Sequence, residues 1–282
     1  MVTFPGNTEL PSLALGTWRM GEVAARRKRE VAAVRAAIEM GWRVIDTAEM
    51  YGEGGAEAVV GEALAAALRS GAVARDELFV VSKVYPHNAG ALAAGAACER
   101  SLQRLGLEHL DCYLLHWRGS VPLAETVAAF ERLRERGRIR SWGVSNFDVA
   151  DMVELFALPG GERCATNQVY YSLTARGPGF DLVPWLQQRG VATMAYSPID
   201  QGALAANKAL AAIAERRGFS AAQLALAWLT AQRGVMAIPK ATSEAHLREN
   251  LAAAAVVLDD AERAAIDRAF PPPRRKTPLT MI

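Results

Sequence analysis

Four side chains that can bind or transfer protons follow short apolar runs of the sequence. Asp46 ends one such run, and Tyr51 follows it by five residues. Lys83 and His116 each end a later run of the same kind. Taken singly, each has an ordinary structural explanation: a helix cap, a packed phenol, a surface lysine and a core histidine. Their shared position after apolar runs favours one common site, because polar groups that follow strands on a rigid scaffold often serve function.

Together these four side chains predict acid catalysis at a carbonyl group. A tyrosine has a pKa near 10, and a neighbouring ammonium group lowers it. Lys83 can supply that charge, and Asp46 can hold the ammonium group in place. His116 can donate a hydrogen bond to a carbonyl oxygen, which leaves Tyr51 as a general acid. No side chain provides a hydride, so this chemistry implies a nicotinamide cofactor.

Lys83 also leaves a second chemistry open, that of an aldolase that forms a Schiff base with its substrate. Such an enzyme needs a desolvated lysine with a lowered pKa. A carboxylate partner such as Asp46 predicts a charged lysine instead. Borohydride trapping of a substrate on Lys83 would favour the aldolase.

The segments that must position these side chains alternate between two patterns. Short apolar runs typical of buried parallel strands cover 13–15, 44–46, 78–83, 110–116, 139–145, 166–169, 192–196 and 235–240. Helical spacing of apolar residues covers 29–40, 56–70, 90–105, 122–136, 148–157, 181–189, 207–217 and 243–255. Repeated strand–helix units without a linker favour the α/β class and a closed (β/α)8 TIM barrel.

Other segments add to this barrel. The residues Gly6-Asn7 lie between two short extended pieces and predict an N-terminal β-hairpin. An extra pair of C-terminal helices is expected over 220–231 and 259–269, the second opening on an Asp cap. No Pro/Ser-rich linker divides the chain, so residues 1–282 are expected to form a single domain.

Composition excludes several classes of partner. The formal net charge is only +2 and the basic residues are dispersed, so no nucleic-acid surface is predicted. The three cysteines are widely spaced, which favours a reducing compartment over a disulfide framework or a zinc site. No signal peptide or membrane-spanning run is evident, and a cytoplasmic monomer without a bound metal is expected.

The strand ends carry a series of short motifs that identify a resemblance. In order these are Gly16-Thr17-Trp18, Val44-Ile45-Asp46-Thr47-Ala48 with Tyr51-Gly52, Val81-Ser82-Lys83, Leu114-Leu115-His116-Trp117, Gly143-Val144-Ser145-Asn146-Phe147, Asn167-Gln168, Ala195-Tyr196-Ser197-Pro198 and Ile238-Pro239-Lys240. With these motifs the sequence resembles the aldo-keto reductases over essentially its whole length. It is similar to the small bacterial branch that includes methylglyoxal reductases.

The resemblance implies a role for each matching residue. The catalytic tetrad would be Asp46, Tyr51, Lys83 and His116, with Tyr51 as the general acid. Binding of NADPH (NADP+) would involve Gly16, Thr17, Asp46, Ser145, Asn146, Gln168, Tyr196, Ser197, Pro198, Ile199, Gln201, Leu204, Lys240, Ala241, Thr242, His246, Glu249 and Asn250. Within this set, Ser145, Asn146 and Gln168 would bind the carboxamide, Tyr196 would lie under the nicotinamide ring, and 197–204 would wrap the pyrophosphate. The substrate would contact Trp18, Tyr51, Tyr85, His116 and Trp117, with His87 as a further candidate.

The segment after Lys240 departs from the family pattern. Lys240 stands where the family places a lysine against the 2′-phosphate of NADPH. Many members have a serine and an arginine further on, where this chain has Ala241 and His246. Thr242, His246 and Arg248 can substitute, because a phosphate accepts hydrogen bonds from hydroxyl and cationic donors alike. We therefore expect NADPH to be preferred over NADH, with reduced discrimination.

The function implied is the reduction of small-molecule carbonyl substrates to alcohols. Residues 271–282 are few beside the long C-terminal loop of members that take large substrates, so a more open pocket is expected. Small aldehydes and α-dicarbonyl compounds, including methylglyoxal, are the expected substrates. A regulatory barrel that binds the nucleotide without turnover, like the potassium-channel subunits that resemble this family, is the alternative. NADPH binding without turnover of any carbonyl would distinguish it.

Overall fold

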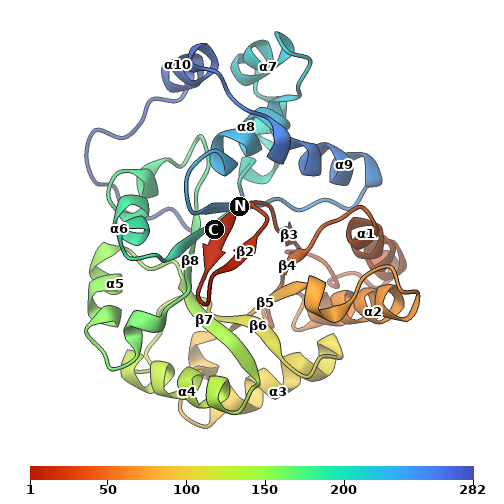
Figure 1. Cartoon of the computed structure of the whole chain (residues 1–282), viewed down its shortest axis with the longest axis vertical. Helices are drawn as coiled ribbons and strands as arrows, with labels where there is room; N and C mark the ends of the chain where they lie inside the picture. The colour runs from red at the N-terminus through yellow and green to blue at the C-terminus, as the bar shows by residue number, and fades with distance from the viewer.

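A barrel of parallel strands forms the centre of the computed structural model, which describes residues 1–282 (Figure 1). The eight strands follow one another around the sheet as β3 (Leu15–Gly16), β4 (Val44–Asp46), β5 (Phe79–Val84), β6 (Leu110–Leu115), β7 (Ile139–Ser145), β8 (Thr166–Tyr170), β9 (Ala192–Tyr196) and β10 (Val235–Ile238). The ends of this sheet meet through a parallel bridge between Leu13 and Ala237. The Gly16 N–H also donates to the Pro239 carbonyl at 2.9 Å. The predicted (β/α)8 barrel is therefore confirmed.

Helices surround the barrel, as Figure 1 shows. They are α1 (Arg27–Glu39), α2 (Gly55–Arg69), α3 (Ala93–Leu105), α4 (Leu123–Glu135), α5 (Val149–Phe156), α6 (Leu182–Gln188), α7 (Lys208–Glu215), α8 (Ala221–Thr230), α9 (Glu244–Ala252) and α10 (Asp260–Ala269). The expected Asp cap of the last helix is present, because Asp259 accepts the Glu262 N–H at 2.7 Å. Each predicted helical segment thus contains a helix.

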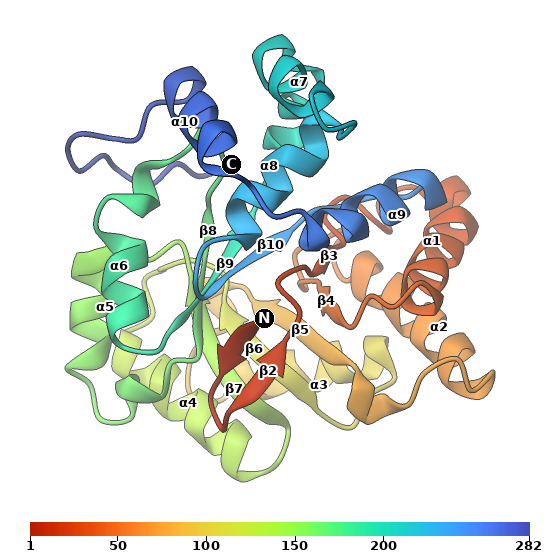
Figure 2. The same ribbon diagram turned by 45° about the horizontal axis from the view of Figure 1, so that its top comes forward.

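One detail of the helix assignment was wrong. The sequence placed the extra pair at 220–231 and 259–269, whereas α8 packs directly on β10 and belongs to the barrel. Nearly every residue of α8 is buried, while α7 buries only Leu210 and Ala214. The outer pair is α7 and α10, which contact each other away from the strands (Figure 2). Both segments have helical periodicity, and that pattern alone does not say which of the two helices packs on the barrel.

The predicted hairpin closes one end of the barrel. Strands β1 (Val2–Phe4) and β2 (Thr8–Leu10) pair antiparallel and lie across that end in Figure 2. The side chains of Val2, Phe4 and Leu10 join the interior cluster of the barrel, which also contains Ala14, Val44, Val81, Cys112, Leu114, Ala165, Ala192, Met194, Met236 and Ile238. This apolar filling leaves the opposite end, where the strands terminate, for polar side chains.

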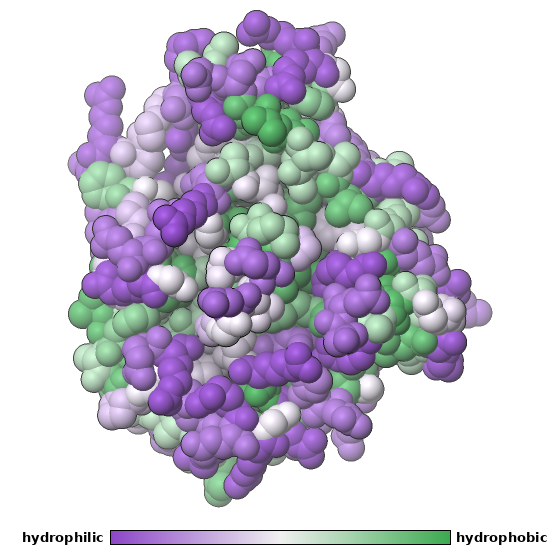
Figure 3. Space-filling view, viewed as in Figure 1, coloured by the Kyte–Doolittle hydropathy of each residue, from purple (hydrophilic) through white to green (hydrophobic).

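The face of the molecule in Figure 3 is mostly hydrophilic, and the three cysteines form no disulfide. Apolar side chains show on this face in small groups between the hydrophilic ones. No helix combines the length and apolar character needed to cross a membrane. Cys98, Cys112 and Cys164 are free and buried, and burial raises the pKa of the Cys98 and Cys112 thiols to about 12.

Candidate functional site

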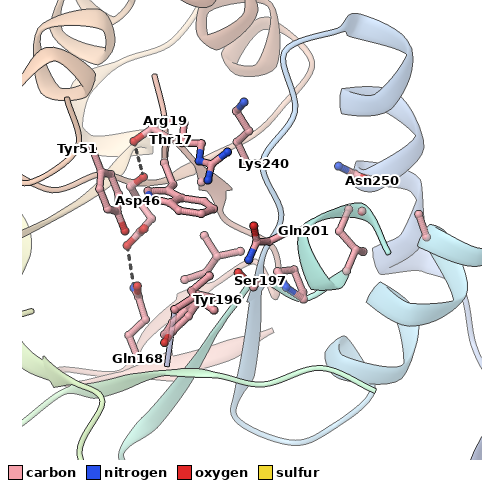
Figure 4. Close-up of a pocket in the computed structure, with 18 of the residues that line it drawn as sticks. Thr17, Arg19, Asp46, Tyr51, Gln168, Tyr196, Ser197, Gln201, Lys240 and Asn250 are labelled. Atoms are coloured by element: carbon pink, nitrogen blue, oxygen red, sulfur yellow. Dashed lines mark hydrogen bonds between the residues drawn. The ribbon is translucent and has the colours of Figure 1, made fainter. Parts of the chain in front are cut away.

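A cavity of about 580 Å³ opens where the barrel strands end. Its volume lies within the range of pockets that hold small molecules and cofactors. The cavity extends from Asp46 and Tyr51 to Lys240 and to Asn250 of α9 (Figure 4), and His116 also lines it. It is therefore an elongated site at the end of the barrel where (β/α)8 proteins carry their function.

Lys83 joins three groups at the floor of this cavity. Its Nζ donates to Asp46 Oδ2 at 2.7 Å, to the Thr47 carbonyl at 2.9 Å and to Tyr51 Oη at 3.1 Å. The lysine side chain is 0% exposed, so all three of its donors are used within the protein. Strands β4 and β5 pair in register and bring Asp46 and Lys83 together. The loop after β4 places the hydroxyl of Tyr51 next to the same ammonium group.

The charge on Lys83 is set by two opposing effects. Burial alone would lower the pKa of the ammonium group, but the Asp46 carboxylate and the Tyr51 hydroxyl raise this pKa above its ordinary value. Lys83 is therefore a charged, hydrogen-bonded group at neutral pH. The aldolase alternative required a lysine with a lowered pKa, and the structure shows the opposite.

The pKa of Tyr51 differs from the sequence-based expectation. Burial raises the pKa of its phenol, and the lowering effect of Lys83 does not offset this. The expected influence of Lys83 is present, but the expected net shift toward neutral pH was wrong. The reason is that the phenol is desolvated by the same walls that surround Lys83, and Asp46 opposes the phenolate as well. Tyr51 consequently keeps its proton at neutral pH.

His116 faces Tyr51 across the site. The two rings meet edge to face with centroids 5.7 Å apart. Burial, together with the nearby Lys83 charge, holds the pKa of His116 well below its usual value. The imidazole is therefore neutral at pH 7 and donates from one nitrogen only. Its Nδ1 is buried without a hydrogen-bond partner in the protein.

The residues expected around the carboxamide form one hydrogen-bonded group. Gln168 Nε2 donates to Asp46 Oδ1 at 2.8 Å, which links β8 to β4 across the barrel (Figure 4). Ser145 Oγ donates to the Gln168 carbonyl at 2.8 Å. Asn146 accepts from Tyr196 Oη at 2.9 Å and donates to the His116 carbonyl at 3.3 Å. The side-chain carbonyl of Gln168 accepts no hydrogen bond within the protein and remains available to an amide donor.

The other half of the cavity is lined by several polar side chains and a lysine. Ser197, Pro198, Ile199 and Gln201 line one wall, and Lys240, His246, Glu249 and Asn250 line the other. The Lys240 ammonium group forms no ion pair, and burial together with Arg26 and Arg19 lowers its pKa against the opposing effect of Glu30. An anionic ligand would supply the charge partner that this lysine lacks.

Some predicted contact residues lie outside the cavity lining. Leu204 and Ala241 are buried behind the wall, and Thr242 does not line the cavity either. Tyr85 donates its hydroxyl to Glu53 at 2.8 Å. Its ring stacks on His87 and meets the ring of Trp117 edge to face, so Tyr85 supports a wall residue rather than lining the cavity itself.

Other lining residues were missed from the sequence. They are Arg19, Met50, Ala205, Ser220, Ala222, Ile238 and Ile282. Arg19 directly follows Trp18 and its guanidinium group lies 4.5 Å from the centre of that ring, so its position in a strand-end loop was a usable signal. Ile282 was not predictable from the sequence, because it belongs to the C-terminal tail rather than to a strand end. Ion pairs of Lys276 with Asp148 and Asp181 hold that tail against the barrel. The tail therefore borders the expected open pocket.

The residues present fit an NADP(H) molecule. The cavity is elongated and offers a free acceptor on Gln168 at one end and an unpaired cation, Lys240, at the other. Tyr196 lies between them, and its ring stacks on that of Tyr170 with centroids 5.6 Å apart. No group of His, Cys, Asp and Glu side chains has the arrangement of a metal site.

Comparisons with known proteins agree with this geometry. Residues 12–270 match the model of the aldo/keto reductase family. The chain is 53% identical to the methylglyoxal reductase YeaE of Escherichia coli (strain K12), covering 100% of this chain and 99% of that protein. It is 36% identical to the glyoxal reductase of Bacillus subtilis (strain 168), covering 88% and 85% of the two chains. The crystal structure of an aldo/keto reductase from Klebsiella pneumoniae in complex with NADP and acetate superposes with a TM-score of 0.94 at 50% identity, over 100% and 99% of the chains.

Proposed function

The chain belongs to the aldo/keto reductase family, and we propose that it reduces small aldehydes and α-dicarbonyl compounds such as methylglyoxal to alcohols. It is an NADP-dependent oxidoreductase that acts on carbonyl groups. The observation that carries the proposal is the contact of Lys83 with both Asp46 and Tyr51, beside a cavity of about 580 Å³ that both Gln168 and Lys240 line. We also propose that residues 1–282 act as a single domain.

The proposed reaction divides its work between the cofactor and four side chains. NADPH supplies the hydride when bound. Tyr51 is protonated at neutral pH and donates its proton to the carbonyl oxygen as negative charge develops there. The Lys83 ammonium group, 3.1 Å from Tyr51 Oη, stabilises the phenolate that this transfer leaves. Asp46 keeps the ammonium group charged and in place, which lets a strongly buried phenol act as an acid.

His116 has a complementary role in this proposal. Because its imidazole is neutral, it donates one hydrogen bond to the carbonyl oxygen without adding a second positive charge beside Lys83. A donor placed where charge develops stabilises the transition state more than the ground state. Trp117 lies against His116 with ring centroids 5.0 Å apart and limits how the ring can turn.

The substrate class rests on the walls of the cavity and on the relatives. Trp18 and Trp117 line it with flat apolar surface, and Ile282 of the tail borders it. Such walls suit a short carbonyl compound with few polar groups to satisfy. Relatives named methylglyoxal reductase and glyoxal reductase cover most of the chain, which supports α-dicarbonyl compounds as substrates.

The test is NADPH oxidation over a panel of carbonyl compounds, with Tyr51→Phe measured in parallel. We expect turnover of methylglyoxal and small aldehydes by the natural sequence. Loss of general acid catalysis in Tyr51→Phe should lower kcat by about 10²- to 10⁴-fold. NADPH binding by this variant should persist, since the ring is retained. Activity on steroids or sugars without activity on small aldehydes would refute the substrate class, and an active Tyr51→Phe would refute the role of Tyr51.

Two further features are part of the proposal. The free, buried cysteines support action in a reducing compartment, which we place in the cytoplasm. We propose a monomer that needs neither a membrane nor nucleic acid as a partner. Size-exclusion chromatography with light scattering tests the monomer directly.

A further inference from the structure

The segment that follows β9 has an unusual backbone. Ser197, Asp200 and Gln201 all adopt left-handed conformations, with φ of 49°, 50° and 52°. Residues other than glycine rarely adopt this conformation, and it persists where the surrounding structure holds it in place. Ser197 and Gln201 line the cavity, whereas Asp200 between them does not. The segment therefore turns one carboxylate away from the cavity while its neighbours face it.

Tyr170 is the residue that holds this carboxylate. Its hydroxyl donates to Asp200 Oδ1 from the last position of β8. The Tyr170 side chain is nearly buried, and its ring stacks on Tyr196 with an interplanar angle of 19°. Tyr196 in turn donates to Asn146. Tyr170 thus connects the segment 197–202 to the aromatic side chain at the centre of the cavity.

We propose that Tyr170 is a positioning residue for cofactor binding, acting through Asp200. This inference rests on the proposed function and on the expectation, from the family resemblance, that residues 197–204 wrap the pyrophosphate of NADPH. A carboxylate released toward those phosphates would repel them, because like charges a few ångströms apart cost free energy even with partial solvent screening. The hydroxyl of Tyr170 keeps the carboxylate on the far side of the segment.

The contribution of Tyr170 is separable from its ring. Tyr170→Phe keeps the stacking on Tyr196 and removes only the hydroxyl. Tyr171→Phe is a matched control, because Tyr171 is the adjacent buried tyrosine and its hydroxyl donates to Gln232 at 2.8 Å, outside the cavity lining. Asp200→Asn keeps a hydrogen-bond acceptor for Tyr170 and removes the charge.

The experiment measures NADPH affinity by quenching of tryptophan fluorescence, which Trp18 and Trp117 in the cavity wall report. Loss of a hydrogen bond to a charged group should weaken NADPH binding by Tyr170→Phe about tenfold or more. Asp200→Asn and Tyr171→Phe should bind as the natural sequence does. The double variant Tyr170→Phe/Asp200→Asn should recover most of the lost affinity, because no carboxylate remains to repel the phosphates.

The outcomes separate this inference from the function on which it rests. Failure of the natural sequence to bind NADPH would overturn the proposed function before any variant is compared. Normal binding by a folded Tyr170→Phe would overturn the positioning role, as would equal weakening in Tyr171→Phe. A double variant as weak as Tyr170→Phe would overturn the electrostatic argument. Melting curves for each variant separate loss of affinity from loss of fold, and the double variant serves as a second test if Tyr170→Phe folds poorly.

Discussion

The buried ion pair between Lys83 and Asp46 leads to a prediction that tests stability and catalysis separately. Lys83→Met removes the ammonium group and leaves the Asp46 carboxylate nearly buried, with Gln168 as its remaining hydrogen-bond donor. Breaking a buried ion pair from one side costs about 3–5 kcal/mol of unfolding free energy. For a chain of this size that corresponds to a fall in Tm of roughly 6–20 °C, at about 2–4 °C per kcal/mol.

The double variant Lys83→Met/Asp46→Asn removes both charges together. Replacing a buried pair by neutral groups of similar volume is often neutral or stabilising, so most of the lost stability should return. Activity should not return, because the phenolate of Tyr51 then lacks the cation that stabilises it. We expect kcat to stay about 10²-fold or more below that of the natural sequence in both variants.

Thermal unfolding and NADPH oxidation with methylglyoxal measure the two quantities on the same samples. A double variant that regained activity along with stability would refute the role of Lys83 in proton transfer. A single variant that lost less than about 1 kcal/mol would refute the claim that Asp46 depends on this partner. NADPH binding, followed by fluorescence, ensures that loss of activity is not loss of the cofactor.

Three further predictions concern the rest of the site. In the folded protein the pKa of His116 is lowered, so below about pH 6.5 the unfolded chain binds one more proton than the folded chain. The free energy of unfolding should therefore fall by up to about 1.4 kcal/mol for each pH unit below that value. In His116→Phe, urea unfolding at several pH values should show a smaller fall per pH unit, and an equal fall would contradict the neutral imidazole. Lys240→Ala should weaken NADPH binding by about tenfold or more and leave NADH binding unchanged, and unaltered NADPH affinity would refute the phosphate contact. Gly55→Ala would place a Cβ 2.5 Å from the Gly21 carbonyl oxygen and displace the loop that carries Tyr51, which should lower kcat by about 10- to 100-fold. The control is Gly95→Ala, which should leave kcat unchanged because no atom lies within 4 Å of the added Cβ.

Much of the fold followed from local patterns in the sequence. Each barrel strand was an apolar run bounded by turn residues, and each helix had its own periodicity. The order of strands was then set by the right-handed succession of βα units. Periodicity alone could not decide whether α7 or α8 covers β10, because it predicts a helix in both adjacent segments. That choice depends on which face is buried, a property of the assembled barrel.

The site was predictable to the extent that barrel topology gathers strand ends. This rule placed Asp46, Lys83 and His116 together from positions far apart in the chain. It could not predict that Gln168 would bind Asp46, since that contact joins opposite sides of the barrel. Nor could it predict Ile282, whose tail follows no strand and is held by ion pairs to other loops.

The pKa of Tyr51 shows that knowing which residues form a site does not by itself give their protonation behaviour. The sequence indicated an ammonium group beside a phenol, which by itself lowers the phenol pKa. In the structure the phenol and the ammonium group share one dry enclosure, so desolvation of the phenolate exceeds the attraction of Lys83. The phenol is protonated at neutral pH with or without this shift, so Tyr51 can act as the acid in either case. Burial makes its proton harder to give up, and the Lys83 ammonium group limits that cost by stabilising the phenolate.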